Sequence, residues 1–210
     1  MKFIVSQILN FLVRSKVIES NSDELDYYRY GIEISISSIL NVILILILGA
    51  VTRHFIESIV FLTVFISMRS FAGGFHADTY VRCNLIMCTS FLIETVLYEL
   101  VKKQINIVLA VVLTAVFLMV IIVFSPVENP NKPITEIQKK RFKVISILLW
   151  ILFAVIGVIL IHKKICVGTM IVLTLALVSI MIIAAKVKER RNCYEKNNRK
   201  DNQNIHRTYG

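Results

Sequence analysis

The chain has 210 residues and a formal net charge of +10 at pH 7, and 56% of its residues are hydrophobic. Soluble domains contain about 45–50% apolar residues, so this composition excludes an ordinary soluble protein and indicates an integral membrane protein. The positive charge does not indicate nucleic-acid binding, because the basic residues flank the apolar segments, where anionic lipids attract them. No long polar region is left for a second domain, so any activity must come from helix ends and short connections.

Residues 1–20 are predicted to form an amphipathic helix that lies in the membrane interface. Projected at helical spacing, the polar residues fall on one side and the apolar residues on the other. The apolar residues are Ile4, Val5, Ile8, Leu9, Phe11 and Leu12. A short helix packed on the membrane bundle is the alternative. The segment lacks the uninterrupted apolar core and the cleavage site of a signal peptide.

Six apolar segments follow, and crossing a membrane takes about 20 apolar residues in a helix. The segments are 32–51, 55–68, 81–100, 105–124, 144–161 and 165–185. We therefore predict an all-α, polytopic membrane bundle over residues 21–185, with four to six full spans. The second segment is the shortest, and it either spans the membrane or dips in and returns.

A histidine lies between the second and third apolar segments, and a cysteine lies near the start of the third, close to a glycine pair. Gly73 and Gly74 precede His76, and Cys83 follows seven residues after the histidine. An imidazole that takes the proton of a thiol creates a strong nucleophile. On a straight helix the two side chains would lie about 10 Å apart, so the chain must bend back at the glycines for them to act together.

Two more side chains in this connection are candidates for the site. Arg69, or the backbone N–H groups of the two glycines, is a candidate to face a developing oxyanion. Asp78 is a local candidate to orient His76. A metal site is not expected, because His76, Asp78 and Cys83 give at most three ligands without the usual paired spacing.

All three prolines of the chain lie in the segment 125–133, which begins the longest connection between apolar segments. Prolines stop the preceding helix and favour a rigid, turn-rich element. Basic residues in and after this segment are candidate docking points for an acidic peptide: Lys132, Lys139, Lys140 and Arg141. Anchoring to the membrane surface is the alternative interpretation of the same residues.

The distribution of charge predicts the orientation in the membrane. If six helices begin and end in the cytoplasm, the inner segments carry most of the Lys and Arg residues, as the positive-inside rule requires. Both termini and the Gly-Gly-His segment are then cytoplasmic, and Cys83 stays a reduced thiol. Residues 186–210 are basic and lack apolar periodicity, so we predict a disordered cytoplasmic tail there.

Two motifs together resemble the accessory gene regulator B family of Gram-positive bacteria. The first comprises Arg69, the run Ala-Gly-Gly-Phe-His-Ala at 72–77, and Cys83. The second is the proline segment 125–133, with the sequence Ser-Pro-Val-Glu-Asn-Pro-Asn-Lys-Pro. The resemblance extends over residues 24–185, and the joint occurrence of both motifs makes it specific.

This resemblance implies a function for several residues. Family members are membrane cysteine endopeptidases of the bacterial cell membrane that process a quorum-sensing pre-peptide. The catalytic histidine of the family matches His76, and the nucleophilic cysteine matches Cys83. Arg69 and Gly74 match further positions required for activity, and Lys132 falls in the loop associated with substrate handling.

The implied reaction removes the acidic C-terminal tail of an AgrD-like pre-peptide. The signal portion stays on Cys83 as a thioester, which an internal cysteine or serine of the peptide attacks to give a thiolactone or lactone. The resemblance also implies a homodimer, and the reaction needs no cofactor. The substrate and the membrane lipids are then the expected partners.

Two other functions remain open from the residues alone. A non-enzymatic multi-pass transporter or membrane binding protein would depend on intramembrane polar residues such as Glu94 and not on His76 or Cys83. An S-acyltransferase would instead carry a fatty acyl group on Cys83.

Overall fold

The computed structural model describes residues 2–15, 22–73, 80–127 and 135–208, and the regular structure in these ranges is helical throughout. The helices are α1 (Lys2–Arg14), α2 (Ser22–Val51), α3 (Phe55–Ala72), α4 (Tyr80–Val101), α5 (Ile107–Phe124), α6 (Glu136–His162) and α7 (Val167–Thr208). Six of them, α2 to α7, are long and apolar enough to cross a membrane. The predicted all-α membrane bundle is thus confirmed.

The second apolar segment forms a longer helix than predicted. Helix α3 ends at Ala72 and has 18 residues, which corresponds to about 27 Å along the axis. Membrane-spanning helices have about 17–25 residues, so α3 is among the shortest helices that can cross the hydrocarbon core.

Helix α6 begins at Glu136, eight residues before its predicted start, because a capping box precedes it. The Thr135 hydroxyl accepts from the backbone N–H of Gln138 at 3.4 Å, and the Gln138 side chain accepts from the Thr135 N–H at 3.1 Å. The two contacts satisfy donors that a helix start otherwise leaves unpaired. The basic residues after 136 therefore lie on a helix.

The last helix differs from the prediction of a disordered tail at 186–210. Helix α7 passes through Ala185 without a break and continues to Thr208. Lys, Glu and Arg have high helix propensity, so a polar segment that follows an apolar helix can prolong it. Lys186 and Glu189 add an ion pair of 2.8 Å on one face of this extension.

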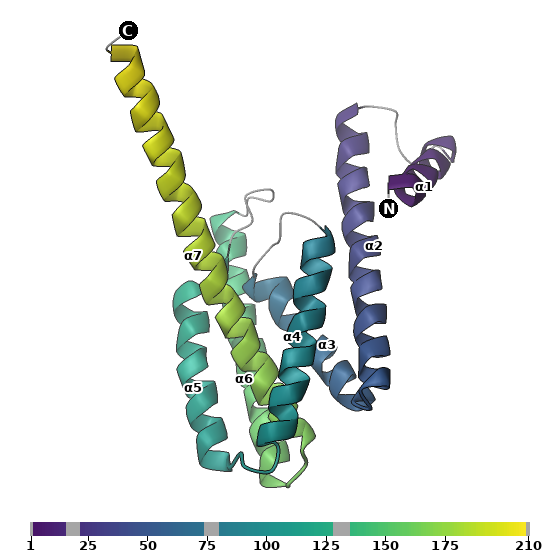
Figure 1. Ribbon diagram of the computed structural model, residues 1–210, viewed down its shortest axis with the longest axis vertical. Helices are drawn as coiled ribbons and strands as arrows, with labels where there is room; N and C mark the ends of the chain where they lie inside the picture. The colour runs from purple at the N-terminus through teal and green to yellow at the C-terminus, as the bar shows by residue number, and fades with distance from the viewer. Residues whose placement is uncertain (1, 16–21, 74–79, 128–134, 209–210) are drawn as a thin grey trace.

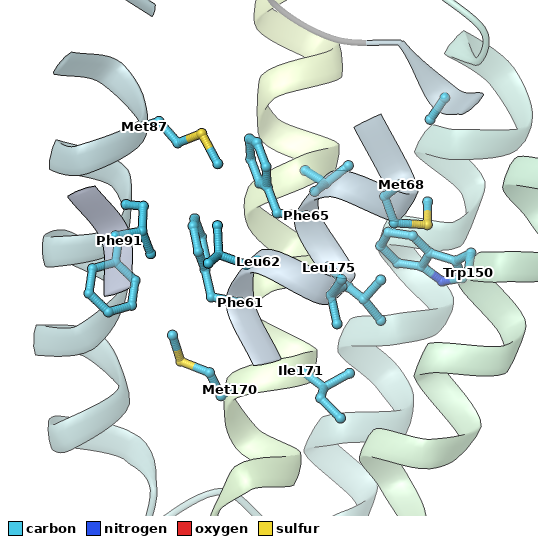
Figure 2. Close-up of a cluster of buried hydrophobic side chains, with 14 of the residues drawn as sticks. Phe61, Leu62, Phe65, Met68, Met87, Phe91, Trp150, Met170, Ile171 and Leu175 are labelled. Carbon is cyan, nitrogen blue, oxygen red and sulfur yellow. The ribbon is translucent and has the colours of Figure 1, made fainter. Parts of the chain in front are cut away.

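Helix α3 lies near the centre of the bundle. Figure 2 shows Phe61 and Phe65 of α3 between Phe91 of α4 and Leu175 of α7. The rings of Phe61 and Phe65 stack at 5.3 Å, and Phe61 also meets Phe91 at 5.3 Å. Trp150 of α6 is buried in the same core. Helix α7 is buried to a still larger extent, whereas α2, α4, α5 and α6 leave most of their spans exposed, as expected for a surface that faces lipid.

Helices α6 and α7 approach each other closely at two glycines. A Cβ on Gly168 would lie 2.5 Å from the carbonyl oxygen of Gly157, closer than real contacts allow. Small residues of this kind let backbones approach in membrane bundles, where packing drives helix association. This crossing fixes α7 against α6.

Helix α1 lies beside the upper part of α2 in Figure 1. Its residues Val5 and Leu9 are buried, whereas Phe11 is 69% exposed. The helix therefore packs on the bundle and also leaves an apolar side chain available to lipid. Its location in the interface stays a prediction.

Both sequence motifs adjoin the same end of the bundle, which we call the loop end. The end of α3, the start of α4, the end of α5 and the start of α6 lie there (Figure 1). The short turns that join α2 to α3, α4 to α5 and α6 to α7 lie at the opposite end. The alternating direction of the helices thus brings residues near 72, 83 and 127 into one region.

Candidate active site

Cys83 lies near the start of α4 and is half-buried. The Nη2 atom of Arg69, in the last turn of α3, donates to the Cys83 Sγ atom at 3.6 Å. The guanidinium group also lies 5.7 Å from the centroid of the Phe65 ring, which limits its freedom. Arg69 was predicted to face an oxyanion, and the structure places it against the sulfur itself. The guanidinium group is thus in direct contact with the predicted nucleophile.

Gly73 ends α3 in a conformation that other residues rarely adopt. Its φ is 76° and its ψ is −165°, a region populated almost only by glycine. A side chain at this position would also clash, because its Cβ would lie 2.5 Å from the carbonyl oxygen of Val127 and 2.9 Å from the Val127 nitrogen. Helix α3 therefore ends at Gly73 with a positive φ, whereas the predicted fold-back of His76 over Cys83 stays a prediction because residues 74–79 lie outside the described ranges.

The start of the proline segment is hydrogen-bonded to the end of α3. The backbone N–H of Val127 donates to the carbonyl oxygen of Ala72 at 3.0 Å, and the Ser125 hydroxyl donates to the same oxygen at 3.5 Å. The carbonyl groups in the last turn of a helix have no partner within the helix, so these contacts satisfy one of them. The two motifs thus meet at the end of α3, a contact that the sequence analysis did not predict.

The other predicted site residues are divided between described and undescribed parts of the chain. Gly74, His76, Asp78 and Lys132 lie outside the described residues. Lys139, Lys140 and Arg141 lie in the first two turns of α6; the last two are exposed, and Lys139 is paired with Glu136 at 3.9 Å. Phe142, beside them, packs against Phe71 of α3 with ring centroids 6.0 Å apart. The basic turns of α6 are thereby joined to the helix that carries Arg69.

Within the described ranges, no group of three or more His, Cys, Asp or Glu side chains is arranged to hold a metal ion. The prediction that the site needs no metal stays a prediction, because His76 and Asp78 lie outside those ranges.

The hydrogen-bond partners of Asn84, the residue next to Cys83, were not predicted from the sequence. The Asn84 side chain of α4 accepts hydrogen bonds from Ser37 and Asn41 of α2, at 3.2 and 2.9 Å. Asn and Ser in a segment predicted to cross the membrane were the available signal, since polar groups there need partners. The partners themselves could not be inferred from spacing.

The buried carboxyl of Glu94 has a partner that the sequence did not indicate. Glu94 of α4 accepts from the Thr174 hydroxyl of α7. Glu94 is only 3% exposed. It belongs to a helix contact within the bundle.

Comparison with known protein sequences points to one family. The sequence model of the family described as accessory gene regulator B matches residues 5–183. An AgrB-like protein 2 of Clostridium perfringens strain 13 is 31% identical over 143 residues, which are 61% of this chain and 67% of the relative. The accessory gene regulator protein B of Staphylococcus saprophyticus is 24% identical over 161 residues, which are 76% of this chain and 84% of the relative. No solved structure matches the chain.

The family model covers most of the chain and includes the six candidate spans almost completely. The motifs that carry the resemblance, around Arg69, Cys83 and residues 125–133, all lie inside the matched region. The chain is therefore a multi-pass membrane protein that belongs to the accessory gene regulator B family.

Proposed function

We propose that this protein is a membrane-embedded cysteine endopeptidase that removes the C-terminal tail of a quorum-sensing pre-peptide and promotes cyclisation of the remainder. The observation that carries the proposal is the contact between Arg69 and Cys83, two motif residues from different helices that meet at the loop end. Membership of the accessory gene regulator B family supports the same substrate class.

In the proposed first step, His76 takes the proton of Cys83, and the thiolate attacks the carbonyl carbon of the bond to be cleaved. The carbon–nitrogen bond then breaks, and the proton passes from His76 to the leaving amine of the tail. The signal portion of the peptide remains bound to Cys83 as a thioester. Arg69 lies beside the sulfur, where its positive charge would stabilise the attacking thiolate.

In the second step, the thiol of an internal cysteine of the peptide attacks the thioester carbonyl. A new thioester bond forms within the peptide, the bond to the Cys83 sulfur breaks, and Cys83 recovers its proton. An internal serine would give a lactone in the same way. The exchange consumes no water and no oxidant, so the site must exclude water from the acyl-enzyme, and a position at the edge of the hydrocarbon helps to do so.

The loop end would face the cytoplasm in this proposal, because the basic residues concentrate there. The exposed side chains of Lys140 and Arg141, on the helix that packs against the end of α3, suit an acidic peptide tail. Lys132 and Lys139 are proposed to contribute to the same interaction. We also propose that the protein forms a homodimer in the membrane.

Co-expression with a pre-peptide tests this function. Cys83→Ala and His76→Ala should each abolish cleavage, while both variants still reach the membrane. Cys88→Ala is the matched control, since Cys88 is another half-buried cysteine of α4, and it should leave cleavage intact. Retained cleavage in either of the first two variants would reject the assigned pair.

Detection of the intermediate distinguishes an endopeptidase from an S-acyltransferase. After incubation with pre-peptide, mass spectrometry of the Cys83 peptide should show an adduct with the mass of the signal portion, and hydroxylamine should remove it. A fatty acyl adduct on Cys83 would support the S-acyltransferase instead. For a transporter, neither adduct is expected.

A further inference from the structure

A small polar cluster joins α2 to α4 one residue beyond Cys83. It consists of Ser37 and Asn41 of α2 and Asn84 of α4, and we call it the α2–α4 polar cluster. The Ser37 hydroxyl and the Asn41 amide both donate to Asn84 Oδ1, at 3.2 and 2.9 Å. Ser37 and Asn41 are separated by four residues, so they lie on the same face of α2.

The cluster faces inward on a helix that also carries exposed large apolar residues. Ser37 and Asn41 are 5% and 7% exposed, whereas Ile39 and Ile43 on the same helix are 60% and 47% exposed. In a membrane the outward residues can face lipid, and a polar group without a partner is costly. Helix α2 is thus held against α4 at this level by polar side chains.

The hydrogen-bonding of the cluster is incomplete. Asn41 Oδ1 is buried and has no donor among the described residues. Turning the amide over would leave the nitrogen without an acceptor in its place, so one polar atom stays unpaired in either orientation. An arrangement selected only for stability would replace such a group with an apolar one. The cluster therefore suggests a role that stability does not explain.

The position of Asn84 in the sequence indicates that role. Successive residues of a helix project 100° apart, so the direction of Asn84 towards α2 also sets the direction of Cys83. Cys83 points to Arg69 of α3, on a different neighbour from the one that Asn84 contacts. A rotation of α4 by about 20° would move a side-chain atom 5 Å from the axis by roughly 2 Å.

We propose that Asn84, Ser37 and Asn41 are positioning residues that hold α4 at the rotation in which the Cys83 thiol meets Arg69. The proposal rests on the proposed function of Cys83 as the nucleophile. None of the three residues needs to contact the substrate. A displacement of about 1 Å at a reacting atom can cost about a hundredfold in rate, so the loss of the cluster should lower kcat more than it changes KM.

The test compares variants in proteoliposomes with a purified pre-peptide. Asn84→Leu removes the shared acceptor, and a triple variant, Ser37→Ala with Asn41→Leu and Asn84→Leu, removes every polar group and avoids stranded donors. Asn84→Asp keeps oxygen acceptors for both donors. Ser38→Ala is the matched control, since Ser38 is the exposed neighbour of Ser37.

The proposal expects kcat to fall at least about tenfold in Asn84→Leu and in the triple variant, with KM within about twofold, and expects Asn84→Asp to recover most of the rate. Ser37→Ala should lower kcat more than Ser38→Ala. The effects of Ser37→Ala and Asn84→Leu should not add, because both break the same contact. Normal kcat in a folded triple variant, or equal effects of Ser37→Ala and Ser38→Ala, would overturn the proposal.

A second measurement does not depend on peptidase activity. In a background without the other cysteines, Cys88, Cys166 and Cys193, the rate at which a maleimide modifies Cys83 reports on its surroundings. This rate should change in the triple variant and should not change in Ser38→Ala. If Cys83→Ala retained cleavage, the proposed function would fail, while the maleimide rates would still decide whether the cluster positions Cys83. Unchanged modification of Cys83 in the folded triple variant would count against the proposal.

Discussion

The backbone N–H of Val127 donates a hydrogen bond of 3.0 Å to the carbonyl oxygen of Ala72, although 55 residues separate them. This bond joins the two motifs of the sequence at the end of α3, directly before the glycine pair. Ser125 donates to the same oxygen, so the start of the proline segment is held at two points. The segment that leads from α3 towards His76 therefore starts from a fixed backbone.

Gly73→Ala should disturb this junction. The substitution forces a residue with a Cβ into a φ of 76°, which costs about 1–3 kcal/mol, and places the Cβ 2.5 Å from the Val127 oxygen. We expect cleavage of the pre-peptide to fall at least about tenfold, because the chain towards His76 is redirected. Gly31→Ala is the control, since a Cβ at Gly31 meets nothing within 4 Å. Equal activity of the two variants would show that the junction does not position the site.

Arg69→Lys tests the contact with Cys83 at constant charge. An arginine presents several donors in a rigid fork, whereas a lysine has one flexible ammonium and a shorter reach. The Nη2 contact of 3.6 Å with the Cys83 sulfur should therefore be lost, and kcat should fall about tenfold or more. Steady-state cleavage kinetics in proteoliposomes provide the measurement. Arg53→Lys, in the exposed turn after α2, is the matched control and should keep the rate of the unmodified protein.

The helices were largely predictable, whereas their contacts were not. Apolar length indicated all six candidate spans, although α3 ends at Ala72, four residues beyond the predicted segment. A membrane helix such as α5 is apolar on all sides, so its sequence does not show which face a neighbour covers. The partners of Arg69, Asn84 and Glu94 depend on the rotation of each helix, and for that reason spacing along the chain could not give them.

Local signals explain two of the helix boundaries that differ from the prediction. The start of α6 followed from Thr135 and Gln138, a capping box that hydropathy does not detect. The continuation of α7 beyond 185 followed from helix propensity, which a search for apolar periodicity ignores. Both cases concern polar residues next to a membrane span.

Gly168→Val should destabilise the bundle through the crossing of α6 and α7. The first carbon of the new side chain would lie 2.5 Å from the Gly157 oxygen and 2.9 Å from the Ile161 nitrogen, so the helices must separate. Overpacking of this kind costs about 1–3 kcal/mol. The thermal midpoint of unfolding in detergent should fall by several degrees, whereas in Gly31→Val it should change little. An unchanged midpoint for Gly168→Val would mean that the crossing is looser than the structure indicates.

Glu94→Gln distinguishes the peptidase from a transporter. Gln has nearly the same shape as Glu and keeps the oxygen that accepts from the Thr174 hydroxyl, so the contact between α4 and α7 should survive. Glu94 is buried in this contact, and we therefore expect cleavage within about twofold of the unmodified protein. A transporter that uses an intramembrane carboxyl should lose its function in this variant, because an amide cannot take up and release a proton as a carboxyl does.

Glu94→Leu completes this test. The variant removes the acceptor, but the Thr174 hydroxyl can turn its single hydrogen to the Met170 carbonyl oxygen, 2.9 Å away, and is not left unpaired. We expect a modest loss of stability of about 1 kcal/mol, visible as a lower thermal midpoint, with cleavage retained at temperatures where the protein is folded. Cleavage that disappears in Glu94→Gln while the thermal midpoint stays unchanged would instead assign Glu94 to the chemistry, and the carboxyl would then have to leave Thr174 during the reaction.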